Sequence, residues 1–306
     1  MRSITTTIST STQANRVHIL GLGSIGNFVA HSLSEIPNGP SVTLLLHRKS
    51  LLDAYKKTET KYWYDFETLH DGEWYRTSAG EPDSESYSSA SPITDVIDNL
   101  IICVKATQTV DALRPIHHRL TSQSNILFLQ NGSGMIEEVN AHLFTNPNKR
   151  PSYLIGVISH GVTLNSPFNI THTGFSATSV GPVPRESVSS TLLSNDCSTD
   201  GPPTTNHLLQ TLTLSPRLNL TSYSYTSILQ IQLEKLAVNA FCNPLCALND
   251  SRNGFLFTIP ETRREILTEI SDVVLALPEL KHALGLEERF SVDNLENTVN
   301  GIIQKT

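Results

Sequence analysis

A lysine and two asparagines recur at intervals of four residues in a long, mostly apolar stretch, residues 228–254. Strong helix formers precede Pro244, so we expect a buried helix that carries Cys242 and Cys246. On it Lys235, Asn239 and Asn243 would share one flank over roughly 12 Å. Burying an ammonium and two amides is costly unless polar groups meet them. The flank is therefore either an internal hydrogen-bond network or a ligand site, where the ammonium could donate a proton.

A glycine-rich turn near the N-terminus predicts a phosphate site. The apolar run Arg16–Leu20 leads into GLGSIG, and helical spacing of apolar residues follows. Strand, glycine turn and helix in this order are typical of a dinucleotide-binding unit, and the alternative is a plain tight turn. The contacts we expect with a dinucleotide come from the whole turn: Gly21, Leu22, Gly23, Ser24, Ile25 and Gly26.

The end of the second predicted strand indicates which dinucleotide is bound. Ser41–Leu46 is followed by His47, Arg48 and Lys49, where an NAD site usually places a carboxylate for the ribose hydroxyl. A basic corner suits the 2′-phosphate of NADP, with Arg48 as the expected contact. An ordinary solvated basic corner is the alternative.

Further polar or glycine-rich turns follow three more predicted strands. Lys105 follows the run 99–104, Asn131 follows 125–129, and His160 and Val162 follow 154–158. Because ligands bind at the carboxyl ends of parallel strands, these turns predict the rim of a crevice. A lone histidine such as His160 is more often structural than catalytic.

Size and composition exclude several classes of protein. The chain has 306 residues and a formal net charge of -7, which argues against nucleic acid as a partner. No apolar run is long enough to span a membrane. Four cysteines without metal-like spacing predict no metal site and a reducing, cytoplasmic location. The acid-free, Ser/Thr-rich residues 1–14 are expected to be a flexible tail, with a mitochondrial presequence as the alternative.

The organisation we expect is a tail and two domains. Residues 15–222 would form the NADP-binding α/β domain, with the polar segment 185–206 as a mobile insertion and a helix over 207–213. Residues 223–306 would form an α-helical substrate domain, with further helices over 261–277 and 294–303.

Four motifs together resemble those of the ketopantoate reductase (2-dehydropantoate 2-reductase) family, over nearly the whole chain from Arg16. They are GLGSIG, VKATQTVDAL, LQNGSGMIEEV, and EKLAVNAFCNP with RNG beyond it. The resemblance implies a Rossmann-type domain followed by a smaller all-α domain like the C-terminal domain of 6-phosphogluconate dehydrogenase, with the site in the cleft between them. It also implies NADPH-dependent reduction of 2-dehydropantoate to (R)-pantoate, on the route to pantothenate and coenzyme A. A small-molecule 2-oxo acid is then the expected partner, and a homodimer stays open.

The resemblance also implies roles for individual residues. Lys235 would be the catalytic proton donor. Asn239, Asn243 and Asn253 would line the substrate pocket, and Asn131 would touch both substrate and cofactor. Lys105 and the backbone of Val162 would contact NADPH.

One feature departs from the family pattern. A serine motif of the Asn-x-Ser-Ser-Met type and a glutamate motif of the Glu-Ile-Asp type, both expected after the last helix, are missing from the sequence. We therefore expect a truncated helical domain with an exposed apolar surface on residues 255–306. Two alternatives to the ketopantoate reductase reaction follow: a homologue that binds NADPH without turnover, and a reductase of another 2-oxo acid.

Overall fold

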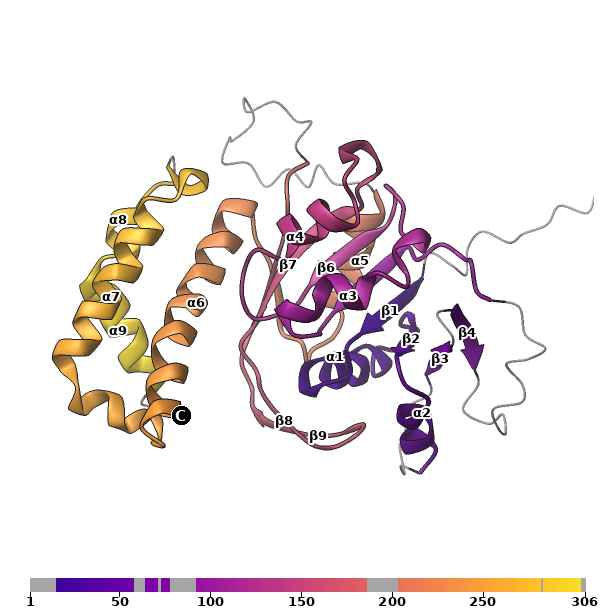
Figure 1. The fold of residues 1–306 in the computed structure, drawn as a ribbon, viewed down its shortest axis with the longest axis horizontal. Helices are drawn as coiled ribbons and strands as arrows, with labels where there is room; N and C mark the ends of the chain where they lie inside the picture. The colour runs from indigo at the N-terminus through magenta and orange to yellow at the C-terminus, as the bar shows by residue number, and fades with distance from the viewer. Residues whose placement is uncertain are drawn as a thin grey trace, which may run out of the picture. The chain divides into compact units, whose positions relative to one another are not determined.

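The computed structural model describes residues 15–57, 64–70, 73–77, 92–185, 203–281 and 283–303. The chain divides into two compact units, Met1–Tyr225 and Thr226–Thr306, and each is described by itself (Figure 1). The expected tail 1–14 and most of the expected insertion, residues 186–202, lie outside the described residues.

Within the described residues, the larger unit contains a nine-stranded sheet in the order β11-β10-β7-β6-β5-β1-β2-β3-β4. The strands of the larger unit are β1 (Arg16–Leu20), β2 (Ser41–Leu46), β3 (Asp65–His70), β4 (Glu73–Thr77), β5 (Asn99–Ile102), β6 (Asn125–Phe128), β7 (Ser152–Ile158), β8 (Gly161–Ser166), β9 (Asn169–Gly174), β10 (Thr178–Pro182) and β11 (Leu220–Ser222). The helices are α1 (Ser24–Ser34), α2 (Lys49–Lys56), α3 (Thr109–Leu113), α4 (Met135–His142) and α5 (Pro203–Thr213).

The centre of the sheet is parallel and doubly wound. From β1 the chain first builds outward through β2 and β3, and then returns to the other side of β1 for β5, β6 and β7. The strand order therefore reverses between β1 and β5, which is where open α/β sheets bind ligands. Antiparallel β4 and β10 extend the two sides. The expected Rossmann-type domain is confirmed.

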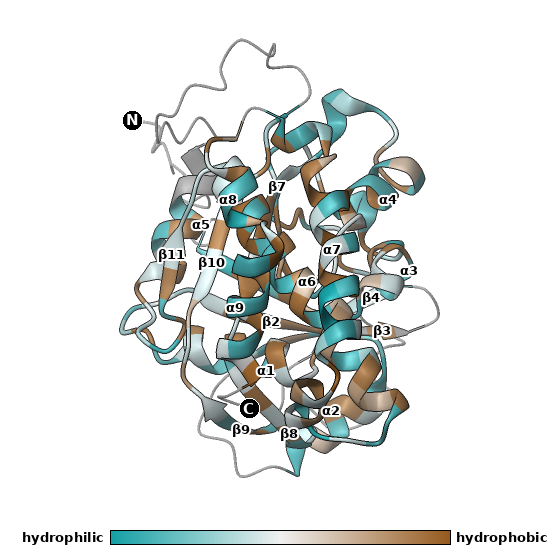
Figure 2. Ribbon diagram, turned by 90° about the vertical axis from the view of Figure 1, so that its left-hand side faces the viewer, coloured by the Kyte–Doolittle hydropathy of each residue, from teal (hydrophilic) through white to brown (hydrophobic). Residues whose placement is uncertain are grey.

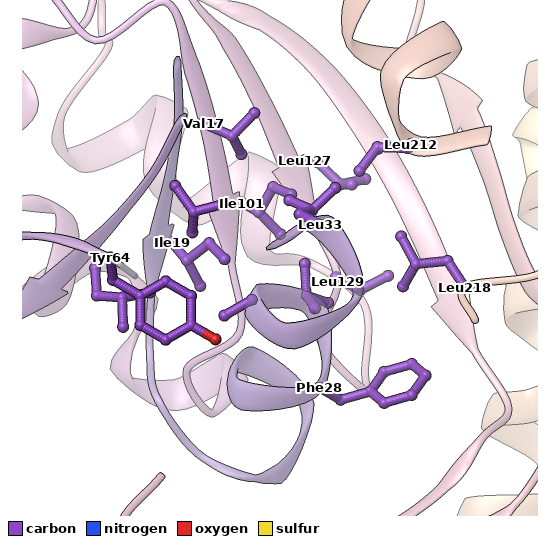
Figure 3. Packing of buried hydrophobic residues seen from close by; sticks show 14 of the residues in the cluster. Val17, Ile19, Phe28, Leu33, Tyr64, Ile101, Leu127, Leu129, Leu212 and Leu218 are labelled. Carbon is purple, nitrogen blue, oxygen red and sulfur yellow. The ribbon is translucent and has the colours of Figure 1, made fainter. Parts of the chain in front are cut away.

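Successive residues of the central strands bury side chains on opposite faces of the sheet. Ile19 joins the apolar cluster under α1, α2 and α5, whereas its neighbour Leu20 joins the cluster under α3 and α4. Leu127 and Phe128 divide in the same way. Figure 3 shows part of the first cluster, to which Phe28 of α1 also belongs. Because a strand alternates its side chains, strands covered by helices on both faces are apolar throughout.

A second, two-stranded sheet continues from the carboxyl end of β7. β8 and β9 pair antiparallel and form a long hairpin (Figure 1). Phe28 of α1 packs against the rings of His160 and His172 at the base of this hairpin, with centroids 4.9 and 4.8 Å away. The hairpin thus covers part of the helix that follows the glycine turn.

A buried ion pair joins β3 to the segment before β6. Both guanidinium NH groups of Arg119 donate to the Glu67 carboxylate, at 2.7 and 3.3 Å, and both side chains are 1% exposed or less. Burial by itself would raise the pKa of Glu67, but hydrogen bonds and charge from His18 and Arg119 hold it at about 2. The carboxylate therefore stays ionised inside the fold.

The smaller unit is helical throughout its described secondary structure. Its helices are α6 (Tyr225–Leu248, starting at the last residue of the larger unit), α7 (Pro260–Leu275), α8 (Leu286–Arg289) and α9 (Val292–Ile303). Ion pairs from Arg263 and Arg264 to Glu296 join α7 to α9, at 3.0 and 3.1 Å. In Figure 2 these helices carry both teal and brown segments, as expected for helices with one buried and one solvent-facing side. The expected all-α domain is confirmed.

One expected boundary was wrong, and one helix runs through a proline. α6 includes Pro244 and continues to Leu248. Proline removes the donor for the carbonyl of Ala240, and because Ala240 is exposed, water can replace that donor. α5 begins at Pro203, inside the segment expected to be a mobile insertion. A proline is well suited to a helix's first position because its missing N–H would have no partner there.

Large apolar side chains are exposed in the segment where we expected an apolar surface. They are Phe257, Val273, Leu275 and Leu284, with Val273 61% and Leu284 84% exposed. That they join in one patch stays a prediction.

None of the helices in the described segments combines the length and the apolar character needed to cross a membrane.

Candidate functional site

The glycine turn has the geometry that a diphosphate requires. Gly21 has φ +99°, which favours glycine, and a Cβ on Gly26 would lie 1.9 Å from the Gly21 carbonyl oxygen. By contrast, a Cβ on Gly23 would meet nothing within 4 Å. The first and third glycines thus allow close packing, and the second leaves open space above the backbone. Because Gly23 is also the N-cap of α1, no side chain of its own caps this helix, and the helix N-terminus is suited to an anion.

Asn27 holds this turn and was missed by the sequence analysis. Its amide nitrogen donates to the carbonyl oxygens of Leu22 at 3.0 Å and Gly23 at 2.9 Å. The residue is 1% exposed. An asparagine one residue after the third glycine was the available signal, but nothing in the spacing says that its side chain turns back to the loop.

The basic corner lies one strand away from the glycine turn. β2 runs parallel to β1 with Leu45 opposite Leu20, so Arg48 and Gly21 both follow carboxyl ends at the same edge of the sheet. Arg48 is exposed and is the N-cap of α2. Burial and the neighbouring charge of Arg48 lower the pKa of His47.

Lys105 and Asn131 follow the next two strands of the same edge. Ile102 of β5 pairs with Leu20 on one side and with Phe128 of β6 on the other. The turns beyond these strands leave Lys105 and Asn131 exposed. The structure therefore brings four of the predicted cofactor elements to one edge: the glycine turn, Arg48, Lys105 and Asn131.

Val162 and His160 follow β7, the strand next to β6. Val162 is the second residue of β8 and is half-buried against the first core cluster. His160 is buried: its Nε2 lies 3.0 Å from the Leu218 carbonyl, and its Nδ1 accepts from the Ser176 N–H at 3.1 Å. Burial lowers the pKa of His160 despite its bond to Leu218, with the charge of His172 lowering it further. The Nδ1 of His160 also lies 3.1 Å from the Nε2 of His172, so the structure places this histidine in a ring cluster at the base of the hairpin.

The polar flank in the smaller unit shares one helix side as expected, but it is less buried than the sequence predicted. Lys235 and Asn239 are half-buried on α6, and Asn243 is exposed one turn further on. Burial lowers the pKa of Lys235 from its ordinary value. A neighbouring side of the helix is held by Arg289 of α8, whose guanidinium binds both carboxylate oxygens of Glu234, at 2.6 and 2.9 Å. Glu234 lies about 100° around the helix from Lys235, so this ion pair sets the rotation of the flank.

Asn253 joins the same flank. It begins the 3₁₀ turn Asn253–Thr258 that follows α6, and the Sγ of Cys246 lies 3.5 Å from its Oδ1. Cys246 is three residues beyond Asn243 on α6, within about 60° of it around the axis. The chain therefore turns back after α6 and places Asn253 beside the Asn243 end of the flank rather than beside Lys235.

Each unit thus presents polar groups that could meet a ligand. The larger unit has open space above Gly23 and exposed cations at one sheet edge. The smaller unit has an ammonium with a lowered pKa in line with two amides, and Asn253 lies near their far end. Among the described residues no group of three or more histidine, cysteine, aspartate or glutamate side chains could hold a metal ion.

Comparison with known families divides the chain in a similar way. Residues 17–185 match the family model "Ketopantoate reductase PanE/ApbA", and residues 227–306 match "Ketopantoate reductase PanE/ApbA C terminal". The second match reaches the last residue of the chain.

Curated relatives carry two kinds of name. A "Probable 2-dehydropantoate 2-reductase" of Schizosaccharomyces pombe is 32% identical over 292 residues, covering 93% of this chain and 80% of that protein. The "2-dehydropantoate 2-reductase" of Saccharomyces cerevisiae is 27% identical and "Ketoisovalerate reductase BEA2" of Gibberella intermedia 28% identical. The Saccharomyces cerevisiae protein matches 80% of this chain and the Gibberella protein 79%. The chain in turn spans less than two thirds of their own length, 64% of the first protein and 63% of the second.

Solved structures support the fold. A D-mandelate dehydrogenase solved with NADH aligns with TM-score 0.62 at 17% identity, over 92% of this chain and 79% of that one. A dimeric ketopantoate reductase from Staphylococcus aureus aligns with TM-score 0.57 at 16% identity, over 95% and 87%. With family matches over both units and a relative above 30% identity, the chain belongs to the ketopantoate reductase PanE/ApbA family of oxidoreductases.

Proposed function

We propose that the protein reduces 2-dehydropantoate to (R)-pantoate with NADPH, and that Lys235 is the proton donor. The observation that carries the proposal is the flank of α6, where a half-buried lysine with a lowered pKa stands in line with Asn239 and Asn243. Membership of the family and the name of the fission-yeast relative support the same reaction.

The residues of the larger unit fit a dinucleotide. The open space above Gly23 and the start of α1 would take the diphosphate, with Asn27 keeping the turn in shape. Arg48, at the place where NAD sites usually have a carboxylate, would bind the 2′-phosphate and so favour NADPH over NADH. When bound, the nicotinamide supplies the hydride.

Lys235 would act on the substrate oxygen. A ketone that gains a hydride at carbon gains negative charge at oxygen, and an adjacent ammonium stabilises that charge. Its Nζ then gives a proton to the oxygen, which becomes the hydroxyl of the product. Because burial lowers the pKa of Lys235, the ammonium releases this proton more readily than an exposed lysine would.

The amides would recognise the rest of the substrate. 2-Dehydropantoate carries a carboxylate and a hydroxymethyl group, and amide side chains can donate to the first and both donate to and accept from the second. Asn239, Asn243 and Asn253 are the proposed substrate contacts in the smaller unit, and Asn131 is the one in the larger unit. Asn131 would also reach the cofactor, and Lys105 and the backbone of Val162 are the further proposed contacts with NADPH.

A second 2-oxo acid is a candidate because of the ketoisovalerate reductases among the relatives. Ketoisovalerate lacks the hydroxymethyl group of 2-dehydropantoate and is otherwise the same acid. A site that hydrogen-bonds a substrate hydroxyl rejects the analogue without it by up to about 10⁴-fold, because its polar groups are left unpaired. Three amides on one flank therefore favour 2-dehydropantoate.

The discriminating experiment compares kcat/KM for the two acids at saturating NADPH. We expect 2-dehydropantoate to be preferred by at least about 100-fold, and Asn239→Leu and Asn243→Leu to reduce this preference. A higher kcat/KM for ketoisovalerate would assign the protein to the second reaction. NADPH binding without oxidation of NADPH by either acid would instead identify a homologue that binds the cofactor without turnover.

A homodimer is the proposed assembly. The Staphylococcus aureus ketopantoate reductase is described as dimeric. Sedimentation velocity of the purified protein with and without NADPH would give the state directly.

A further inference from the structure

Two turns at neighbouring strand ends touch one another in the larger unit. The first, Val104–Thr109, follows β5 and contains Lys105; the second, Gln130–Gly134, follows β6 and contains Asn131. Gly132 has φ +106°, and a Cβ built on it would lie 3.5 Å from the Cβ of Ala106. The two turns are therefore close enough for a change in one to move the other.

A single buried amide links them. The Nε2 of Gln130 donates to the Val104 carbonyl at 2.7 Å and to the Thr109 hydroxyl oxygen at 2.9 Å. Thr109 in turn donates its hydroxyl to the Ala106 carbonyl at 2.7 Å. Gln130 is 7% exposed and Thr109 fully buried. The turn that carries Lys105 is thus held at its first and last residues by one side chain from the neighbouring turn.

The orientation of this amide is set by its partners. The Val104 carbonyl can only accept, so the NH₂ group of Gln130 must face it, and the Gln130 Oε1 is left buried without a hydrogen-bond partner among the described residues. A buried acceptor without a partner offsets much of what the two bonds contribute to stability. The residue therefore does more to fix the geometry of the turns than to stabilise the fold.

We propose that Gln130 is a positioning residue for the cofactor site: by holding the Val104 carbonyl and Thr109, it keeps Lys105 in the conformation that binds the dinucleotide. This assignment rests on the proposed function, in which Lys105 contacts NADPH. Gln130 itself touches neither substrate nor cofactor in this account.

The opposite end of the same two strands provides a matched control. There the Asn125 amide nitrogen donates to Asn99 Oδ1 at 3.1 Å, and both residues are buried, at 0% and 3% exposed. Gln130→Met and Asn125→Leu each remove one buried amide between β5 and β6, the first at the ligand edge and the second far from it. Thr109→Val is a milder variant that removes one of the two bonds of Gln130.

The test combines NADPH titration, followed by fluorescence, with hydrogen exchange of the cofactor-free proteins. For Gln130→Met we expect a Kd about tenfold higher than wild type and faster exchange in residues 104–109, since a lost buried hydrogen bond is worth about that factor. Thr109→Val should also raise the Kd and speed hydrogen exchange in residues 104–109, but by less than Gln130→Met. Asn125→Leu should lower thermal stability but keep the wild-type Kd.

Two results would overturn the assignment, and they are distinguishable. A wild-type Kd and wild-type exchange in Gln130→Met, or an equal loss of affinity in Asn125→Leu, would show that Gln130 has only a structural role. Failure of the wild-type protein itself to bind NADPH would overturn the proposed function and this assignment with it.

Discussion

The glycine turn allows a paired test in which stability and cofactor affinity should respond oppositely. A Cβ at position 26 would lie 1.9 Å from the Gly21 carbonyl oxygen, whereas a Cβ at position 23 would meet nothing within 4 Å. Gly26→Ala forces the backbone of the turn to move by more than about 1 Å, and we expect it to destabilise the larger unit by about 3 kcal/mol. Gly23 has φ −76°, which alanine adopts readily, so Gly23→Ala should change stability by less than about 1 kcal/mol.

The affinity for NADPH should show the opposite order per folded molecule. The added methyl at position 23 fills the space proposed for the diphosphate and would cost about two charge-assisted hydrogen bonds, roughly 3 kcal/mol or about 100-fold in Kd. Trp74 is buried in the larger unit, and residues 226–306 contain no tryptophan, so tryptophan fluorescence during urea unfolding reports the stability of the larger unit. NADPH fluorescence gives Kd on the same samples. Wild-type affinity in a stable Gly23→Ala protein would refute the placement of the diphosphate.

Three further results are expected. Lys235→Ala should reduce kcat by at least about 10³-fold with little change in the Kd for NADPH. The rate of reduction by the wild-type protein should fall as pH rises through the pKa of Lys235, which lies below its ordinary value. If Lys235→Ala is instead largely unfolded and its folded fraction keeps full activity, Lys235 is a structural residue. Arg48→Ala should weaken the binding of NADPH much more than the binding of NADH. The charge-matched control is Lys57→Ala, since Lys57 is also exposed. An unchanged ratio of the two Kd values in Arg48→Ala would show that Arg48 does not bind the 2′-phosphate. Glu67 has its pKa lowered from 4.5 to about 2, so it contributes about 3 kcal/mol above pH 4.5 that is lost as the pH falls toward 2. The free energy of unfolding, measured with urea from pH 7 to 3, should show this loss in the wild-type protein but not in Glu67→Gln. An equal dependence of that free energy on pH in both proteins would contradict the prediction.

The elements with a strong local signal were predictable from the sequence. β1 and β2 have the expected bounds, because both are apolar runs between polar or glycine-rich turns. The fold class followed from the order of such runs and from the glycine turn. Likewise, Lys235, Asn239 and Asn243 share a flank because spacing by four fixes their direction on any helix.

Contacts between residues distant in sequence had no such signal. The ion pair between Glu67 and Arg119 joins positions 52 residues apart, and neither residue stands in a periodic pattern. Gln130 adjoins a predicted site residue, but only the structure shows that its amide reaches the preceding strand's turn. Asn253 was assigned by resemblance, and the return of the chain to Cys246 supplies the geometry that the sequence could not.

NADPH oxidation, followed by absorbance with and without 2-dehydropantoate, is the decisive measurement for the proposed reaction. We expect oxidation that depends on the acid, saturates with it and is lost in Lys235→Ala. Tight NADPH binding with no acid-dependent oxidation, or oxidation that persists in Lys235→Ala, would contradict it.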